Sequence, residues 1–184
     1  YNNGITGKDT LFIQKASVTV NAVNHGINGK DSLTIKDADI TVTSGGDALR
    51  STNDSDTTLG YLVITGSALK LTAGEDGIQA ETTLTISGGT ATVTTAGGAG
   101  QSISDDTSAK GLKAGTQVAV TGGTLQLNCC DDAIHSNGDV TISGGSFTIA
   151  TGDDGMHADD TLSISSGTID ITRSYEGLEG AKVL

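Results

Sequence analysis

Apolar residues recur along the chain in a fixed order that repeats about every 22 residues. Each repeat opens with a small residue and then an apolar residue, here called the anchor. Further apolar residues follow 6, 8, 13 and 15 positions after it. In the sixth repeat the anchor Ile134 is followed by Val140, Ile142, Phe147 and Ile149. Two apolar residues separated by one polar residue predict a short strand with one buried face. The pattern therefore predicts strands, and no helix.

The spacing of the anchors predicts that the strands stack in successive rungs. Seven spacings separate the anchors, and all are 22 residues except two of 29 and 34; the anchors are Ile5, Ile27, Leu49, Ile78, Leu112, Ile134, Met156 and Leu178. Three short strands and three corners in about 22 residues describe one rung of a parallel β-helix, an all-β solenoid. We expect it to be right-handed, as crossover connections between parallel strands nearly always are. The chain has no Pro, which fits because Pro would remove a donor from the ladder.

We expect residues 1–184 to form a single β-helix domain of seven full rungs and part of an eighth. The two longer spacings predict corner loops near residues 50–61 and 94–110. Their acidic residues, including Asp105 and Asp106, leave two interpretations open: neutral loops, or loops that help to hold a cation. Neither end of the sequence shows the polar cap that solenoids need, so we expect the chain to be part of a longer one.

Composition and charge exclude several classes of function. With 22 acidic and 10 basic residues among 184, the formal net charge is −12. Such a surface disfavours nucleic acid, whose phosphates need basic partners. No apolar run is long enough to span a membrane. High net charge and modest hydrophobicity are also typical of disorder, but the regular apolar spacing excludes that interpretation.

Carboxylates gather just before the anchors of the later repeats. The predicted calcium ligands are Glu75, Asp76, Asp131, Asp132, Asp153, Asp154 and Glu176, with Glu179 just after the last anchor. In stacked rungs these carboxylates lie about 5 Å apart. At an effective dielectric constant near 20 each pair costs about 3 kcal/mol, which predicts a compensating cation. Ca²⁺ fits best, because it takes several oxygen ligands. The alternative is a solvated acidic corner that uses Asp for its turns. Lys110 interrupts the series, and we expect it to neutralise neighbouring carboxylates.

Three further features carry candidate chemistry. His135 and His157 lie 22 residues apart and are therefore predicted neighbours, which either hold a transition metal with Asp or hydrogen-bond along the ladder. Cys129 and Cys130 form either free thiols or a vicinal disulfide. Tyr175, beside the acidic residues, is the preferred aromatic contact for a sugar. Other candidates are Tyr1, Tyr61 and Phe12.

Three strings resemble a known family. They are Asp-Asp-Ala-Ile-His at 131–135, Asp-Asp-Gly-Met-His-Ala-Asp at 153–159 and Ser-Tyr-Glu-Gly-Leu-Glu-Gly at 174–180. They are similar to secreted bacterial carbohydrate-binding domains typified by a surface protein of a cellulolytic clostridium. The resemblance implies a right-handed parallel β-helix shaped like pectate lyases, with bound calcium. It implies binding of cellulose and acidic pectic polysaccharide without lyase activity, in a secreted or cell-surface protein. The acidic motif carries over at 131–132, 153–154, Glu176 and Glu179, and more weakly at 75–76.

The leading hypothesis is a non-catalytic, calcium-binding module for plant or microbial cell-wall polysaccharide. The partner is a polygalacturonate-like polymer, cellulose, or both. A surface at −12 repels an acidic polymer unless Ca²⁺ bridges the two. We expect Tyr175, His135 and His157 to contact the carbohydrate.

Two alternatives remain. A calcium-dependent pectate-type lyase needs a Lys or Arg base, for which Lys110, Lys113, Arg50 and Arg173 are candidates. The other is a structural solenoid, since arrays of outward Thr can order water as in ice-binding proteins, but Thr is also an ordinary strand residue. An adhesive or surface-array role has no sequence signature and stays open.

Overall fold

The protein, examined as a computed structural model, is built from parallel strands. The structure describes residues 2–104 and 106–184, so Tyr1 and Asp105 lie outside the described residues. All strand pairs in the described part are parallel, and no helix occurs in it that is long and apolar enough to cross a membrane. The strands are β1 (Ile5–Gly7), β2 (Thr10–Gln14), β3 (Ser17–Ala22), β4 (Ile27–Gly29), β5 (Ser32–Lys36), β6 (Asp39–Ser44), β7 (Leu49–Ser51), β8 (Tyr61–Ala73), β9 (Ile78–Ala80), β10 (Thr83–Thr95), β11 (Leu112–Ala114), β12 (Gln117–Cys129), β13 (Ile134–Ser136), β14 (Asp139–Thr151), β15 (Met156–Arg173) and β16 (Leu178–Val183).

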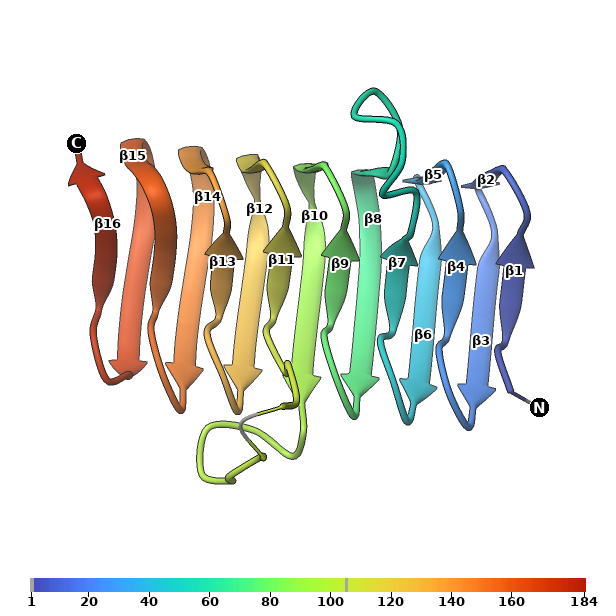
Figure 1. Ribbon diagram of the computed structural model, residues 1–184, viewed down its shortest axis with the longest axis horizontal. Coiled ribbons are helices and arrows are strands. Elements are labelled where there is room, and N and C mark those ends of the chain that lie inside the picture. The colour runs from blue at the N-terminus through green and yellow to red at the C-terminus, as the bar shows by residue number, and fades with distance from the viewer. Residues whose placement is uncertain (1, 105) are drawn as a thin grey trace.

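Each strand pairs with the equivalent strand one repeat later. Anchor pairs with anchor, as in Ile27 with Leu49 and Ile134 with Met156. The register holds across the longer spacings too, since Leu112 pairs with Ile78. Figure 1 shows the consequence: the chain advances along one axis in stacked coils, with the two ends far apart. The predicted stacking of equivalent positions is confirmed.

The number of strands per coil differs from the expectation of three. Coils one and two have three strands each, but from β8 onward the second and third strands merge into one of 13 residues, and β15 runs through a whole coil. The reason is the corner between them. In the first coils it is made by Lys15 and Asp37 at positive φ. Later coils use Gly, such as Gly88 and Gly89 at φ 81° and 86°, and the strand continues through the bend.

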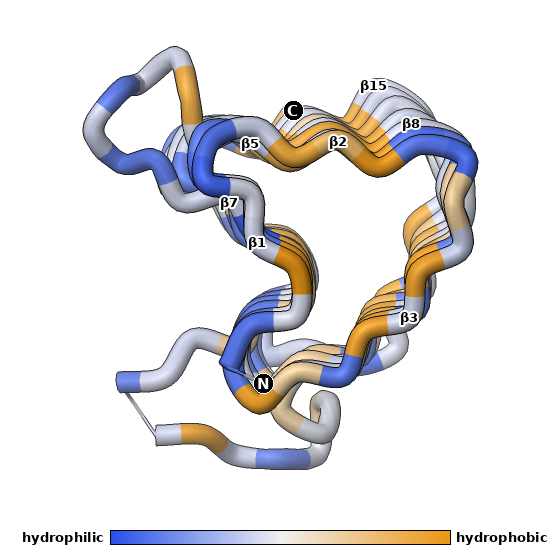
Figure 2. The backbone as a smooth tube through the Cα atoms, turned by 90° about the vertical axis from the view of Figure 1, so that its right-hand side faces the viewer, coloured by the Kyte–Doolittle hydropathy of each residue, from blue (hydrophilic) through white to orange (hydrophobic). Residues whose placement is uncertain are grey.

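The core is a stack of aliphatic columns enclosed by the coils. Figure 2, which looks along the axis, shows hydrophobic residues recurring at the same places around successive coils. Phe147, Ile134 and Leu84 are fully buried there. The first and last coils are less buried, because each lacks a neighbour on one side: Ile5 and Ile171 are only partly covered. Stacking therefore supplies most of the apolar burial.

Both expected insertions leave the coils as loops. Residues 52–60 connect β7 to β8, and residues 96–111 connect β10 to β11. Both project on the side of the short strands β1 and β7, where the cross-section bends inward (Figure 2). In the first loop the Asn53 side chain bonds Asp31 at 2.6 Å and accepts from the amides of Ser55 and Asp56. These loops border the face that carries the candidate site.

Candidate functional site

One side chain per coil forms a ladder with the backbone of the next coil. We call these residues, each two positions before an anchor from Ile27 onward, the turn column: His25, Asp47, Asp76, Lys110, Asp132, Asp154 and Glu176. The backbone N–H of Asp76 donates to Asp47 Oδ1 at 3.1 Å, and that of Asp154 donates to Asp132 Oδ1 at 3.0 Å. The amide of Glu176 donates to Asp154 Oδ1 at 3.1 Å in the same way. The turn-column carboxylates therefore satisfy buried amides that have no strand partner.

Lys110 interrupts this ladder because an ammonium cannot accept a hydrogen bond. Its own amide donates to Asp76 Oδ1 at 2.8 Å, but the next amide, that of Asp132, is satisfied by Asp131 Oδ1 at 2.8 Å. The Lys110 Nζ lies 2.7 Å from Asp131 Oδ1 and 3.1 Å from Asp132 Oδ2. The expectation that Lys110 neutralises neighbouring carboxylates is confirmed.

The groups around Asp132 outweigh the effect of burial on its pKa. Burial alone raises the pKa of this carboxyl, but the hydrogen bond from His135 and the charge of Lys110 outweigh it and hold the pKa at about 2. Burial lowers the pKa of Lys110, and its contacts with Asp131 and Asp132 raise it by more. Both groups are therefore charged at neutral pH.

The negative charge of Asp47 is less well compensated by its neighbours than that of Asp132. Burial, and then the neighbouring Asp76, raise the pKa of Asp47 from 3.8 to about 6. Arg50 lies 3.4 Å from its Oδ2 and only partly offsets this. Burial and Arg50 lower the pKa of His25, whose Nδ1 accepts the Asp47 amide at 3.0 Å. That Nδ1 therefore carries no proton, and its 3.3 Å approach to Asp47 Oδ2 is no ion pair.

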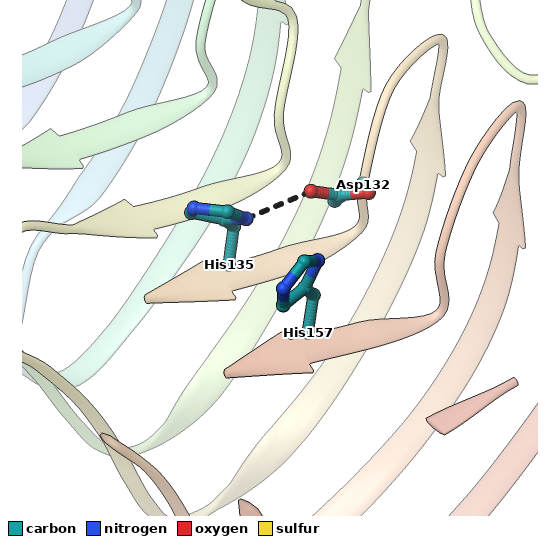
Figure 3. Close-up of side chains that lie close together, drawn as sticks. All are labelled: Asp132, His135 and His157. Carbon is teal, nitrogen blue, oxygen red and sulfur yellow. Dashed lines mark hydrogen bonds and ion pairs between the residues drawn. The ribbon is translucent and has the colours of Figure 1, made fainter. Parts of the chain in front are cut away.

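A second line of side chains runs beside the turn column on the short strands. We call these residues, each one position after an anchor from Leu49 onward, the strand column: Arg50, Gln79, Lys113, His135, His157 and Glu179. Several pair with the turn column, which lies three residues earlier. His135 Nδ1 bonds Asp132 Oδ2 at 2.8 Å, as Figure 3 shows, and Lys113 Nζ reaches Asp76 Oδ2 at 3.1 Å. The two columns together form a polar, charged strip along the short-strand face.

Two polar pockets open along this strip. One of about 340 Å³ lies between both columns and the second insertion, and is lined by Asp47, Arg50, Asp76, Lys113 and residues 106–108 among others. The other, of about 450 Å³, lies between residues 101–104 of that insertion and the turns that carry Asp131 and Asp153. We call the strip and these pockets the groove. Its lining of carboxylates, amides and cations is suited to the hydroxyl and carboxylate groups of a ligand.

The C-terminal end of the groove holds carboxylates that no lysine or arginine pairs with among the described residues. Ligand atoms of Asp154, His157 and Glu179 lie within 4.8 Å of one another. A side-chain hydrogen bond with Asp154 is the main cause that raises the pKa of Glu179. His157 Nδ1 lies 3.4 Å from Glu179 Oε2. Two carboxyl groups this close favour either a shared proton or a cation.

The predicted site residues thus separate into groups. Asp76, Asp132 and Asp154 are buried members of the amide-capping ladder, and the second oxygen of each lies near a strand-column side chain, namely Lys113, His135 and His157 in that order. Asp131 is half-buried against Lys110, and Asp153 is exposed. Glu75 joins Asp47 and His25 in a cluster whose ligand atoms lie within 4.8 Å, and Glu176 is exposed in the last coil.

The predicted carbohydrate contacts lie at one end of the groove. His135 and His157 are register neighbours, with ring centroids 4.9 Å apart and planes at 61° (Figure 3). Tyr175 is 81% exposed in the chain's last turn, and its amide donates to the Asp153 carbonyl at 2.7 Å. Sequence reasoning left Asp47 out of the predicted calcium ligands and considered Arg50 only as a candidate base. The sequence could have indicated Asp47, because it stands two positions before the anchor Leu49, as Asp76 and Asp132 do before theirs.

The structure also shows the surroundings of the two cysteines and of the candidate bases. Cys129 and Cys130 are both buried free thiols, and burial raises the pKa of Cys129 to about 12. The candidate bases Lys110, Lys113 and Arg50 each contact an Asp of the turn column. The guanidinium of Arg173 lies near Gly100 on the second insertion.

Comparison with known proteins places the chain in a family. Residues 1–155 match the family described as carbohydrate-binding domain-containing protein. No curated protein matches. Among solved structures, the polysaccharide lyase-like protein from C. thermocellum, as a gadolinium derivative, is similar with a TM-score of 0.55 and 16% identity. The alignment covers 100% of this chain and 85% of that one, and shows a shared fold. The resemblance found in the sequence is thereby confirmed, and the chain belongs to the family of carbohydrate-binding domain-containing proteins.

Proposed function

We propose that this chain is a non-catalytic module that binds an acidic cell-wall polysaccharide, of the polygalacturonate type, along the groove with the help of calcium. The observation that carries the proposal is the continuous polar strip formed by the turn and strand columns. The 340 Å³ pocket in it presents Arg50 and Lys113 beside carboxylates and amides. We further propose that the fold is a right-handed parallel β-helix and that the protein acts outside the cell, where such polymers lie.

Calcium resolves the repulsion between this chain and an acidic polymer. The net charge is −12, and both partners would bring carboxylates to the groove. Calcium takes oxygen ligands from either side and so joins them. A neutral polymer such as cellulose needs no such bridge, which makes the two ligands separable by experiment.

The carboxylates differ in how well they fit a calcium ion. In the cluster of Asp131, Asp132 and Asp153, the Lys110 ammonium already lies within 3.1 Å of two members. The pair of Asp154 and Glu179 fits better, because no Lys or Arg among the described residues pairs with either carboxylate and their contact raises the pKa of Glu179. We assign the preferred calcium ligands to Asp154 and Glu179, with Glu176 beside them.

The absence of a free base at the groove argues for binding without catalysis. β-Elimination requires an unpaired Lys or Arg near the α-carbon of the uronate. Lys110, Lys113 and Arg50, the basic side chains of the two columns in the described residues, each lie within 3.4 Å of an aspartate oxygen. We therefore expect no unsaturated product from polygalacturonate with or without calcium.

Calorimetry tests the proposal in two steps. Calcium is titrated into chelator-stripped protein, and then oligogalacturonate or a neutral glucan is added with and without calcium. We expect saturable calcium binding and calcium-dependent binding of the acidic oligomer. Glu179→Gln should weaken both, whereas Asp160→Asn, an exposed carboxylate outside the two columns, should change neither. Calcium-independent binding of the acidic oligomer, or equal effects of the two variants, would contradict the proposal.

A further inference from the structure

Three Asn-Gly pairs occur in the chain, and the fold places them in different surroundings. They are Asn3-Gly4, Asn28-Gly29 and Asn137-Gly138. Asn is a thermolabile residue because its side chain can lose ammonia. The loss is easiest before Gly, which has no Cβ to keep its backbone nitrogen away from the Asn side chain. The structure around each pair therefore decides which Asn can react.

Two of the pairs are tied to neighbouring coils. Asn28 is 8% exposed and lies with Gly29 in β4, which pairs with β1 on one side and with β7 on the other. The Gly4 N–H donates to the carbonyl of His25 at 3.0 Å. One pair is thus buried inside a ladder of three strands. In the other, the nitrogen that would have to attack is already bonded to the next coil.

The pair Asn137-Gly138 lies at the corner between β13 and β14 and is held differently. The Asn137 side chain is exposed. The backbone N–H groups of Asn137 and Asp139 donate to carbonyls of the preceding coil at 3.1 and 3.0 Å. The Gly138 N–H between them donates to the Ser136 hydroxyl at 3.2 Å, within the same corner. Among the described residues this nitrogen therefore takes no part in the ladder between coils.

The reaction open to this pair needs only water as co-reactant. The Gly138 nitrogen attacks Cγ of Asn137, so that an N–Cγ bond forms and the Cγ–Nδ2 bond breaks. The proton of the Gly138 N–H leaves with Nδ2 as ammonia, and the product is a cyclic succinimide. Water then opens the ring. Cleavage of the new N–Cγ bond leaves aspartate, and cleavage of the original backbone C–N bond leaves isoaspartate, whose chain runs through Cγ.

The new carboxylate would lie beside a histidine of the strand column. His135 Nε2 lies 3.0 Å from Asn137 Oδ1. In the next coil His157 Nε2 lies 3.4 Å from Oδ1 of Asp159, which stands 22 residues after Asn137. Strands β13 and β15 pair His135 with His157, so the two arrangements are register neighbours. Aspartate at position 137 therefore repeats an arrangement that the fold already accommodates.

We propose that Asn137 is a modification site, at which spontaneous deamidation adds a negative charge beside His135. The fold selects it through the exposure of its side chain and through the Gly138 N–H that is left out of the ladder. The aspartate product keeps the fold. The isoaspartate product inserts a methylene group between two ladder hydrogen bonds and destabilises the corner. The proposal is independent of the polysaccharide function.

Peptide mapping by mass spectrometry tests the site on folded protein incubated at neutral pH, with samples taken over weeks. We expect the peptide with Asn137 to gain the mass that separates an acid from an amide, while the peptides with Asn3 and Asn28 stay unchanged. The same chain in urea should convert at all three positions, because the protecting hydrogen bonds are then lost. Asn137→Gln is the matched control, since its longer side chain closes a ring less readily.

Ion-exchange chromatography supplies a second readout. The aged wild type should yield a species with one more negative charge that elutes with fresh Asn137→Asp, and an isoaspartate species that melts at a lower temperature. Circular dichroism checks that each variant is folded. The proposal is overturned if Asn137 keeps its amide in the folded chain while it converts in urea, or if Asn3 or Asn28 reacts as fast in the folded chain. It is also overturned if Asn137→Gln gains the extra charge at the rate of wild type.

Discussion

The carboxylate of Asp132 accepts the backbone N–H of Asp154, 22 residues later and one coil further on, at 3.0 Å. Its other oxygen holds His135 at 2.8 Å. One aspartate thus joins the backbone of the stack to the side chains of the groove. Asp76, Asp132 and Asp154, which were predicted as calcium ligands, therefore also have a structural role as amide caps, which the turn-chemistry alternative anticipated in part.

Two replacements of Asp132 should distinguish the effect of its hydrogen bond to the Asp154 amide on stability from the effect of its charge. Asp132→Asn and Asp132→Ala both remove the charge, but only Asn keeps an oxygen for the buried amide of Asp154. Leaving a buried donor unsatisfied costs about 1–3 kcal/mol, so the Ala variant should be less stable than the Asn variant by that amount. Urea denaturation in the presence of chelator measures the difference. Equal stabilities would mean that the amide finds another partner.

Asp47 should make the domain more stable in mild acid. Its folded pKa of about 6 lies above the usual 3.8, so the folded state binds the proton more tightly than the unfolded state. Asp47 therefore stabilises the folded state by up to about 3 kcal/mol below pH 4, and this stabilisation is lost as the pH rises through 6. The lowered pKa of His25 acts in the opposite direction, so the measure is the difference from Asp47→Asn. Urea denaturation from pH 4 to 7 should show wild type losing stability relative to that variant. Parallel curves would contradict the prediction.

Removing Lys110 should open the cluster of Asp131, Asp132 and Asp153 to calcium. Lys110→Met leaves the buried Asp132 without its ammonium partner, and breaking such a pair costs about 3–5 kcal/mol. Because Ca²⁺ then replaces the ammonium, the variant should gain a calcium site and recover stability as calcium is added. Thermal melts across a calcium series provide the measurement, with Lys113→Met as the matched control. A melting temperature that rises with calcium no more than that of wild type or of Lys113→Met would exclude this cluster as a site.

The chain's two phenylalanines should differ sharply in their effect on stability. Phe147 is 1% exposed in the core and Phe12 is 55% exposed. Phe147→Ala should lose about 3–5 kcal/mol through lost burial and a cavity. Phe12→Ala should change stability by no more than about 0.5 kcal/mol. Chemical denaturation of both variants tests whether the inward columns carry the stability.

Sequence alone determined the stacking, because a solenoid repeats one local pattern and equivalent residues must then become neighbours. Ile134 beside Met156, His135 beside His157 and both loop positions all follow from counting along the chain. The same reasoning identified Lys110 as the neutraliser of its neighbours. It did not give the number of strands per coil, since whether Gly88 and Gly89 break a strand or only bend it depends on the ladders at either side.

Only the tertiary structure decided what each carboxylate oxygen contacts. Spacing places Asp132 and Asp154 in one column, but their roles depend on side-chain rotation within a turn, which no repeat encodes. That rotation gives one oxygen to a backbone amide and the other to a strand-column side chain. It also turns the Nε2 edges of the two histidines toward Asn137 and Asp159, away from the acidic turn. The physical reason is that backbone periodicity fixes where a side chain starts, whereas local hydrogen bonds and charges fix where it points.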